Sequence, residues 1–206
     1  MKPTDTELKQ AKEEAAKWAQ ERLADANTVI CDTETTGLPS KDPDTEICQL
    51  SITDGRGKPL FSMLLKPNKP MSDEVIGIHG ITNEQVQNQP MFHQVAKVIS
   101  FVLEGKHVVC YNASFDVKLL WSLFKKYDQP LPKIAGASCA MDHYSEWCGE
   151  WSEKKQGWKW QKLPNLSGLP AHDAYSDCLS TLKVMELMAG EFRHEDVSAD
   201  KIDLNF

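Results

Sequence analysis

The chain has no apolar run that approaches the roughly 20 residues of a membrane-spanning helix. Its first residues are polar and charged, which is unlike a secretory signal peptide. Its six cysteines include no Cys-x-x-Cys pair, which argues against a zinc ribbon. Internal repeats and low-complexity stretches are also lacking. These absences predict a soluble cytoplasmic protein with reduced thiols and no membrane contact.

The chain has fewer basic than acidic residues: 23 Lys and Arg against 30 Asp and Glu give a net charge of −7. Proteins that coat nucleic acid without specificity are usually basic, so this class is disfavoured. The negative net charge is still compatible with an enzyme that binds the end of a nucleic-acid strand through metal ions, since the ions themselves supply positive charge. With 206 residues, 41% of them hydrophobic, the chain suits a single globular domain with a real core.

The spacing of apolar residues predicts an α/β protein. The first helix is expected over 4–26 and begins with a capping box of Thr4 and Glu7. Asp54-Gly55-Arg56-Gly57 has the composition of a hairpin turn between two strands. Strands are predicted at 28–33, 47–53, 59–66 and 108–111, and further helices at 72–78, after Pro90, at 114–127 and at 173–189. Three antiparallel strands followed by strand–helix alternation imply a mixed sheet flanked by helices.

The most informative segment is Asp32-Thr33-Glu34-Thr35-Thr36-Gly37, which directly follows the apolar run Val29-Ile30-Cys31. Alternate side chains of a strand share a face, so Asp32 and Glu34 should project together, roughly 6.6 Å apart along the strand. Two carboxylates that close are unfavourable unless a cation lies between them. Their oxygens favour a hard divalent ion such as Mg2+ or Mn2+. The competing explanation is a strand-to-turn boundary that attracts Asp, Thr and Gly for turn geometry alone.

Two further polar segments follow downstream. Asn112-Ala113-Ser114-Phe115-Asp116 comes after the strand predicted at 108–111, and His172-Asp173-Ala174-Tyr175-Ser176-Asp177 opens the last helix. Taken in order, D-x-E-T-T-G, N-x-x-F-D and H-D-A-x-x-D resemble the three motifs of the DEDDh, or DnaQ-like, 3′–5′ exonucleases. This family includes the proofreading subunit of bacterial DNA polymerase III, RNase T and oligoribonuclease. The resemblance covers about 28–190, and all three motifs in order are far more specific than any one of them.

The resemblance implies an RNase H-like fold and a nuclease that uses two Mg2+ or Mn2+ ions. It implies that Asp32 contacts both ions, that Glu34 and Asp177 hold the first, and that Asp116 acts mainly through bound water. His172 matches the residue that takes a proton from the attacking water. The implied catalytic set is therefore His172, Asp32, Glu34, Asp116 and Asp177. Phosphodiester hydrolysis agrees with this set, since two ions roughly 3.5–4 Å apart can position water and relieve phosphate charge, and histidine titrates near neutral pH.

The distance between His172 and Asp177 predicts local structure. Five helical residues turn by about 500°, so the two side chains cannot share a helix face if both are helical. His172 is therefore expected on the loop before the helix, where Gly168 and Pro170 allow irregular backbone, and this loop is expected to become ordered on substrate binding. Asp173 is predicted to cap the helix and not to bind metal.

The same resemblance points to residues that would bind the substrate. His79-Gly80-Ile81-Thr82 is similar to the family segment that lines the pocket of the terminal nucleotide, and Leu38 matches a position that wedges against the last base. Core contacts are the alternative for such apolar side chains, and Asn112 could simply cap the helix that follows. The implied substrate-binding residues are Thr35, Leu38, His79, Ile81, Asn112 and Phe115.

The stretch 147–163 is rich in tryptophan and lysine: Trp147, Trp151, Trp158 and Trp160 alternate with Lys154, Lys155, Lys159 and Lys162. Aromatic residues mixed with lysines are typical of surfaces that bind single-stranded nucleic acid. Alternatively, the tryptophans pack a hairpin onto the core while the lysines remain in water. A turn at Gln156-Gly157 could join two short strands in either case.

Three parts are expected: an N-terminal helix (1–27) packed on the domain, the exonuclease domain (28–190), and an acidic tail (191–206) whose end is expected to be disordered. No separate polymerase or helicase region fits in this length. Proofreading would therefore need a protein partner, for which the N-terminal helix is a candidate contact, and self-association is the other option.

Together these observations predict a metal-dependent exonuclease that acts on the 3′ ends of DNA, by preference single-stranded, and releases nucleoside 5′-monophosphates. The alternative enzyme is an exoribonuclease that trims short RNA or tRNA 3′ ends, because no motif reports on the 2′-hydroxyl. An alternative of another class is a nucleic-acid-end-binding subunit of a repair, replication or CRISPR-adaptation assembly. The complete set of mutually repelling carboxylates argues against lost activity.

Overall fold

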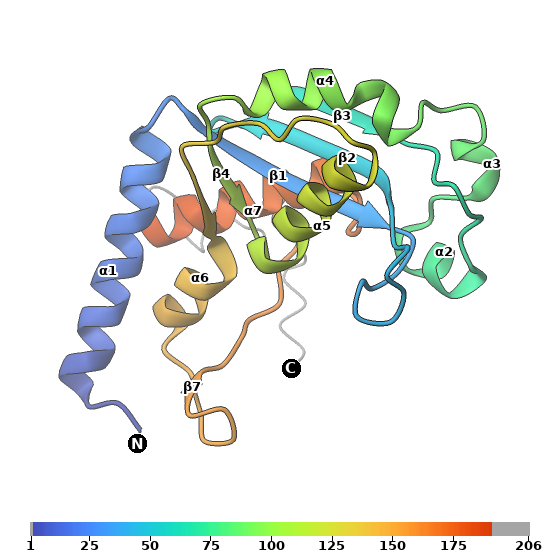
Figure 1. Ribbon diagram of the computed structural model, residues 1–206. Coiled ribbons are helices and arrows are strands. Elements are labelled where there is room, and N and C mark those ends of the chain that lie inside the picture. Colours follow the sequence, from blue (N-terminus) through green and yellow to red (C-terminus); the bar gives the residue numbers. More distant parts are fainter. Residues whose placement is uncertain (1, 191–206) are drawn as a thin grey trace.

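The computed structural model describes residues 2–190, so the predicted tail at 191–206 lies outside the described residues. A five-stranded sheet with helices on both faces confirms the mixed α/β fold (Figure 1). The strands are β1 Thr28–Thr35, β2 Ile47–Asp54, β3 Pro59–Leu64, β4 His107–Cys110 and β5 Gly136–Cys139, with a separate hairpin of β6 Trp151–Ser152 and β7 Gly157–Trp158. The helices are α1 Asp5–Ala24, α2 Asp73–His79, α3 Asn83–Val86, α4 Phe92–Leu103, α5 Ala113–Lys126, α6 Ala140–Cys148 and α7 Ala174–Ala189.

The order of strands in the sheet is β3-β2-β1-β4-β5. β1, β2 and β3 pair antiparallel, whereas β4 pairs parallel with β1 and β5 parallel with β4. The predicted hairpin turn between β2 and β3 is confirmed, since the Gly57 N–H donates to the Asp54 carbonyl over 3.0 Å. Gly57 has a φ of +81°, and a Cβ there would lie 2.8 Å from the Leu179 side chain, so only glycine fits.

The unequal pairing of β1 creates the edge at which polar side chains gather. β1 pairs with β2 as far as its last residue, Thr35, but it pairs with β4 only from Thr28 to Ile30. The second half of β1 therefore has no strand on its β4 side. Helix α5 begins in this gap, directly after β4, so its first turn reaches the exposed flank of β1 (Figure 1).

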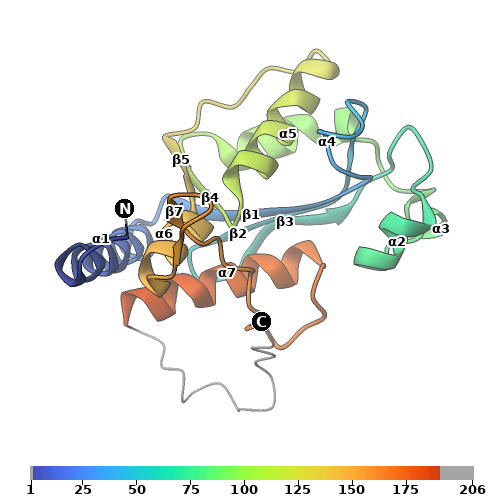
Figure 2. The same ribbon diagram turned by 90° about the horizontal axis from the view of Figure 1, so that it is seen from below.

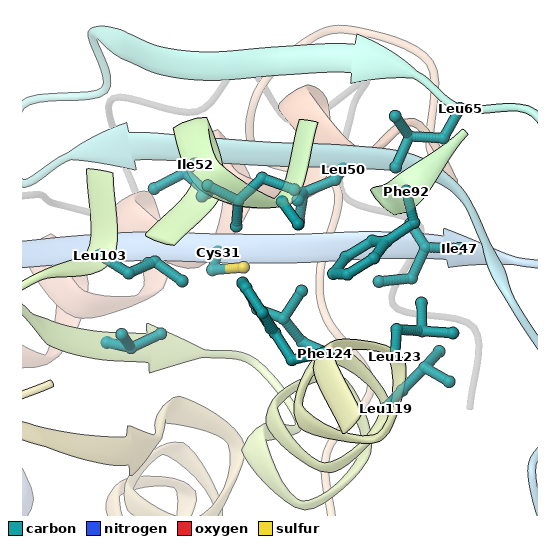
Figure 3. Packing of buried hydrophobic residues seen from close by; sticks show 14 of the residues in the cluster. Cys31, Ile47, Leu50, Ile52, Leu65, Phe92, Leu103, Leu119, Leu123 and Phe124 are labelled. Atoms are coloured by element: carbon teal, nitrogen blue, oxygen red, sulfur yellow. The ribbon is translucent and has the colours of Figure 1, made fainter. Parts of the chain in front are cut away.

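The helices cover the sheet in two layers, which Figure 2 shows with α4 and α5 on one side and α7 on the other. The layer of α4 and α5 encloses the larger core cluster. Phe92 and Phe124 pack edge to face there, with ring centroids 5.2 Å apart, against Leu50 and Ile52 of β2 (Figure 3). Since these side chains are almost fully buried, they hold α5 and its first turn against the sheet.

The N-terminal helix packs on the domain as predicted. Its capping box is present, with the Glu7 N–H donating to Thr4 Oγ1 over 3.3 Å. Ala15 and Ala19 are fully buried against α6 and α7, in the second core cluster. Small residues at these positions let α1 approach its neighbours closely, and Trp18 stacks on His143 of α6 at 4.0 Å between ring centroids.

Several elements were not anticipated from the sequence. α3, β5 and α6 are short, and the strand 136–139 is built from small residues without a clear alternation of apolar side chains. The turn in the tryptophan-rich stretch lies at 153–156 and not at Gln156-Gly157, because Gly157 pairs with Ser152. In the part of the chain that the structure describes, no helix is long and apolar enough to cross a membrane, and all six cysteines are free thiols.

Candidate active site

The second half of β1, which has no strand on its β4 side, carries the two carboxylates that the sequence singled out. Asp32 and Glu34 lie on the same face of the strand, directed toward the α7 layer, while Thr33 between them is directed toward α5. Glu34 is only 8% exposed. A buried strand thus carries two acidic groups to a place where few solvent molecules can stabilise their charge.

Asp116 reaches the same place from the first turn of α5. Its Oδ1 accepts a 2.7 Å hydrogen bond from Thr33 Oγ1, and its backbone N–H donates to the Asn112 carbonyl at 3.3 Å. Both Thr33 and Asp116 are buried. The α5 side of β1 therefore orients one acid toward the two on the α7 side.

Asp177 and His172 come from the N-terminal end of α7. Asp177 lies in the first turn, and His172 precedes the helix in the left-handed region with a φ of 58°. The prediction that His172 lies on the loop and not in the helix is confirmed. Asp173 caps the helix by accepting the Ser176 N–H at 3.0 Å, which confirms its predicted role as a cap.

Gln49 of β2 holds this helix end against the sheet. Its Nε2 donates to Asp173 Oδ2 at 2.7 Å, and its Oε1 accepts the Ala174 N–H at 3.0 Å. Gln49 also pairs in register with Glu34 on the neighbouring strand. One buried amide therefore helps to fix where the residue after His172 lies relative to Glu34.

The electrostatics of the site show the crowding of its acids. Burial and the charges of Asp177 and Asp116 raise the pKa of Glu34 to about 8. Burial raises the pKa of Asp116 to about 6, against the hydrogen bond from Thr33 that lowers it. Burial, followed by the charges of Asp116, Asp177 and Glu34, raises the pKa of Asp32 well above its usual range.

Asp177 differs because a histidine faces it. Burial raises the pKa of Asp177, while the charge and the backbone of His172 act in the opposite direction. Asp32 and Glu34 share a face of β1, Asp116 accepts from Thr33 between them, and Glu34 and Asp177 offer oxygens within 4.8 Å of each other. The four carboxylates therefore converge although they come from three remote segments. Without a cation, such a group holds protons that it would not hold in water.

Three side chains of this group could hold a metal ion together. Ligand atoms of Glu34, His172 and Asp177 all lie within 4.8 Å of one another. Carboxylate oxygens suit Mg2+ and Mn2+, and an imidazole nitrogen is also accepted by Mn2+ or Zn2+. The donor set therefore fits a divalent cation.

Two cavities flank the first turn of α5. The first, of about 330 Å³, is lined by residues of the loop after β1 and of α5, among them Leu38 and Phe115. The second, of about 480 Å³, is lined by Asn112, His172 and Asp177 together with Trp160 and its neighbours. Of the residues that the sequence marked for substrate binding, Leu38 and Phe115 line the first cavity and Asn112 lines the second.

The other residues marked for substrate binding, Thr35, His79 and Ile81, do not line these two cavities. Ile81 is 8% exposed and packs in a small cluster with Cys48 and Met71, so its position is largely one of core packing. His79 accepts the Ile81 N–H at Nδ1 over 3.0 Å, and burial together with the charge of His172 lowers its pKa. Thr35 donates from Oγ1 to the Gly37 carbonyl at 2.8 Å and so shapes the loop that carries Leu38.

Sequence reasoning missed Gln49 and Thr33 as the partner of Asp116, whereas Trp160 and Lys162 of the second cavity belong to the stretch that it had marked as a candidate surface for single-stranded nucleic acid. A polar residue inside the apolar run Ile47-Cys48-Gln49-Leu50 was the available signal for Gln49. The hydroxyl of Thr33 gave no signal of its own, because threonine is common in strands.

Comparison with known proteins agrees with this geometry. The chain matches the model of the RNase T exonuclease family over residues 29–185. An uncharacterized exonuclease, CP81, of Escherichia phage 186 is 31% identical over 187 residues, which cover 85% of this chain and 92% of the phage protein. The epsilon subunit of DNA polymerase III from Pasteurella multocida is 32% identical over 105 residues, 48% of this chain and 42% of that subunit. The chain spans about half the length of the epsilon subunits it matches.

Solved structures share the fold. A zinc-bound complex of E. coli exonuclease I with single-stranded DNA is similar with a TM-score of 0.61 and 18% identity, over 80% of this chain and 40% of that one. The nuclease domain of 3′hExo, a DEDDh family member bound to rAMP, has a TM-score of 0.54 and 17% identity, over 81% and 94% of the two chains. The sheet and its flanking helices are therefore those of the RNase H-like exonucleases.

Proposed function

The chain belongs to the RNase T family of exonucleases, and we propose that it is a metal-dependent 3′–5′ exonuclease that removes nucleoside 5′-monophosphates from the 3′ ends of single-stranded DNA. The observation that carries this proposal is the convergence of Asp32, Glu34, Asp116 and Asp177 beside His172. The raised carboxyl pKa values mark a place that a divalent cation would stabilise.

The residues present fit a pair of divalent ions, since four acids supply hard oxygen ligands: Asp32 and Glu34 from β1, Asp116 from the first turn of α5 and Asp177 from the first turn of α7. In this proposal Asp32, Glu34 and Asp177 hold the ions, and Asp116 acts through water. When bound, such ions supply Lewis-acid polarisation of the phosphate and of the attacking water.

His172 is proposed as the general base. His172 lines the second cavity together with Asp177, and a ring nitrogen there could take a proton from water. Asp173 and Gln49 keep the helix end, and with it His172, in place.

Leu38 and Phe115 are proposed to bind the end of the strand. Leu38 is 48% exposed at the first cavity, with Phe115 on the other wall. An exposed apolar side chain beside an aromatic ring can separate two stacked bases and hold one of them. This arrangement favours an unpaired 3′ end.

Labelled oligonucleotides test polarity, substrate and metal together. DNA and RNA oligomers with a 5′ or a 3′ label are incubated with Mg2+, Mn2+, Zn2+ or EDTA. We expect a ladder of shortening fragments from the 5′-labelled strand, immediate release of labelled mononucleotide from the 3′-labelled strand, and no reaction in EDTA or with the Asp32→Ala variant. Activity that survives EDTA would contradict the proposal, as would mononucleotide release from the 5′ end. Faster degradation of RNA would assign the enzyme to exoribonucleases instead.

A further inference from the structure

The tryptophan-rich stretch 147–163 divides into packed and exposed residues. Trp151 and Trp158 pack edge to face across the β6–β7 hairpin, with ring centroids 5.4 Å apart. Trp147 stacks on Tyr144 of α6 at 6.0 Å. Trp160 is the exception, because 60% of it is exposed. Contacts with other aromatic rings therefore account for three of the tryptophans, whereas Trp160 has most of its surface in solvent.

Trp160 is exposed but not loosely held. On one side of it the Lys159 N–H donates to the Glu150 carbonyl at 2.8 Å. On the other side the Gln161 carbonyl accepts the Tyr111 hydroxyl at 2.9 Å, and the Gln161 N–H donates to Ser145 Oγ at 3.3 Å. The backbone on both sides of Trp160 is thus tied to the body of the domain, which gives the ring a defined position.

A cation covers one face of this ring. Lys155 Nζ lies 3.9 Å from the centroid of Trp160, within the range of a cation–π contact. Since 60% of Trp160 is exposed and the residue lines a cavity, part of its ring beyond the lysine contact can meet a flat partner. The positive charge beside it would also attract a phosphate group.

The position of Trp160 connects it with the catalytic residues. It lines the cavity of about 480 Å³ that Asn112, His172 and Asp177 also line, and Lys162 lies on the same wall. This volume lies within the usual range for sites that bind small organic groups. An aromatic ring, a cation and the proposed general base therefore share one cavity.

We propose that Trp160 is a stacking platform for an unpaired nucleobase of the substrate strand, with Lys162 beside the strand's phosphate groups. The inference rests on the proposed function, since it adds a second contact point next to the same catalytic centre. Stacking on a fixed indole needs a base that is free of its neighbours, so the platform selects single-stranded nucleic acid.

Kinetics and equilibrium binding with single-stranded DNA test this platform. Trp160→Ala and Trp160→Leu remove the aromatic face, whereas Trp160→Phe retains one. Phe101→Ala is the matched control. Phe101 is 83% exposed and lies on α4, at the end that leads into β4 and away from the site. We expect Trp160→Ala and Trp160→Leu to raise KM about tenfold with kcat within about twofold, and Trp160→Phe to stay within about threefold of the parent protein. The Phe101→Ala variant should match the parent.

Binding is measured in parallel with each change placed in an Asp32→Asn background, by anisotropy of a 5′-fluorescein oligonucleotide. The dissociation constants should rise by the same factors as KM. An unchanged KM and Kd in Trp160→Ala, or a Leu variant that binds as well as the Phe variant, would overturn the platform. If the parent protein binds DNA through Trp160 but does not degrade it, the proposed nuclease function is rejected and the stacking platform is retained. If the protein degrades DNA and substitutions of Trp160 have no effect, the platform is rejected and the nuclease function is retained.

Discussion

Gln49 and Asp173 lie 124 positions apart in the chain, yet Gln49 Nε2 donates a 2.7 Å hydrogen bond to the carboxylate of Asp173. The same amide accepts the N–H of Ala174, so it both completes the cap of α7 and ties it to β2. Glu34 lies beside Gln49 in the sheet. A side chain that is not itself acidic therefore contributes to the placement of the residues of α7 relative to the acids of β1.

We predict that Gln49→Ala lowers kcat about tenfold while KM changes by less than about twofold, because His172 and Asp177 lose their position relative to Glu34. Two hydrogen bonds of a buried amide are lost, so the free energy of unfolding should fall by about 2 kcal/mol. Steady-state kinetics and urea unfolding measure both. Gln10→Ala, on the exposed face of α1, is the control and should change neither. Parent-like kcat in the Gln49 variant would show that the helix end needs no such tie.

His172→Ala should lower kcat at least 100-fold and leave the affinity for Mn2+ nearly unchanged, if His172 acts as the base. The structure makes this test sharp, because His172 is also close enough to Glu34 and Asp177 to be a ligand. Isothermal titration with Mn2+ compares His172→Ala with Glu34→Gln. An equal loss of Mn2+ affinity in both variants would make His172 a metal ligand instead.

The metal-free protein should lose stability as the pH rises. Glu34 has a usual pKa of 4.5 but about 8 in the folded chain, so the folded state keeps a proton that the unfolded state has released. Stability contributed by this proton is present in full below about pH 4.5 and disappears as the pH rises toward 8. In EDTA the melting temperature should therefore fall between about pH 5 and about pH 8, and less steeply for Glu34→Gln.

Adding Mn2+ at about pH 8 should reverse that loss, since the ion replaces the protons that the acids release. The gain in melting temperature should be larger for the parent protein than for Glu34→Gln. Thermal melts with and without Mn2+ at both ends of the pH range give the comparison. A melting temperature that is independent of pH in EDTA, with no response to Mn2+, would mean that the four acids do not form a cation site.

Glu46 offers a stability prediction of the opposite sign. It is buried at the start of β2, where burial would raise its pKa, but hydrogen bonds from Asn68, Tyr127 and Lys126 outweigh burial and lower it. A depressed carboxyl pKa stabilises the fold above the usual value of 4.5 and loses this effect as the pH falls. Glu46→Gln should cost about 2 kcal/mol at neutral pH.

The difference between Glu46→Gln and the parent should shrink as the pH drops below about 4.5, because the protonated parent then resembles the amide. Urea unfolding at about pH 7 and about pH 3.5 measures it. The exposed pair of Asp44 and Lys69 supplies the control, since Asp44→Asn should leave stability nearly unchanged at either pH. A constant difference across this range would show that the charge of Glu46 is not what stabilises the start of β2.

Local signals predicted much of the fold. Short apolar runs marked β1 and β2, a turn of Asp and Gly marked the hairpin, and Thr4 with Glu7 marked the start of α1. These features depend on neighbours a few positions away, so they can be read without the rest of the chain. β5 and α6 were missed because their small and mixed residues carry little periodicity, and they form through contacts with β4, α1 and α7.

The resemblance of the three polar motifs, taken in order, to those of the DEDDh exonucleases singled out the acids and the histidine from the sequence. Only the tertiary structure decided how these groups meet: β1 extends past β4, α5 enters the gap, and Gln49 holds α7 in place. It also separated Trp160 from the other tryptophans. The physical reason is that burial and hydrogen bonding between remote segments depend on the folded shape, and no local pattern of residues records them.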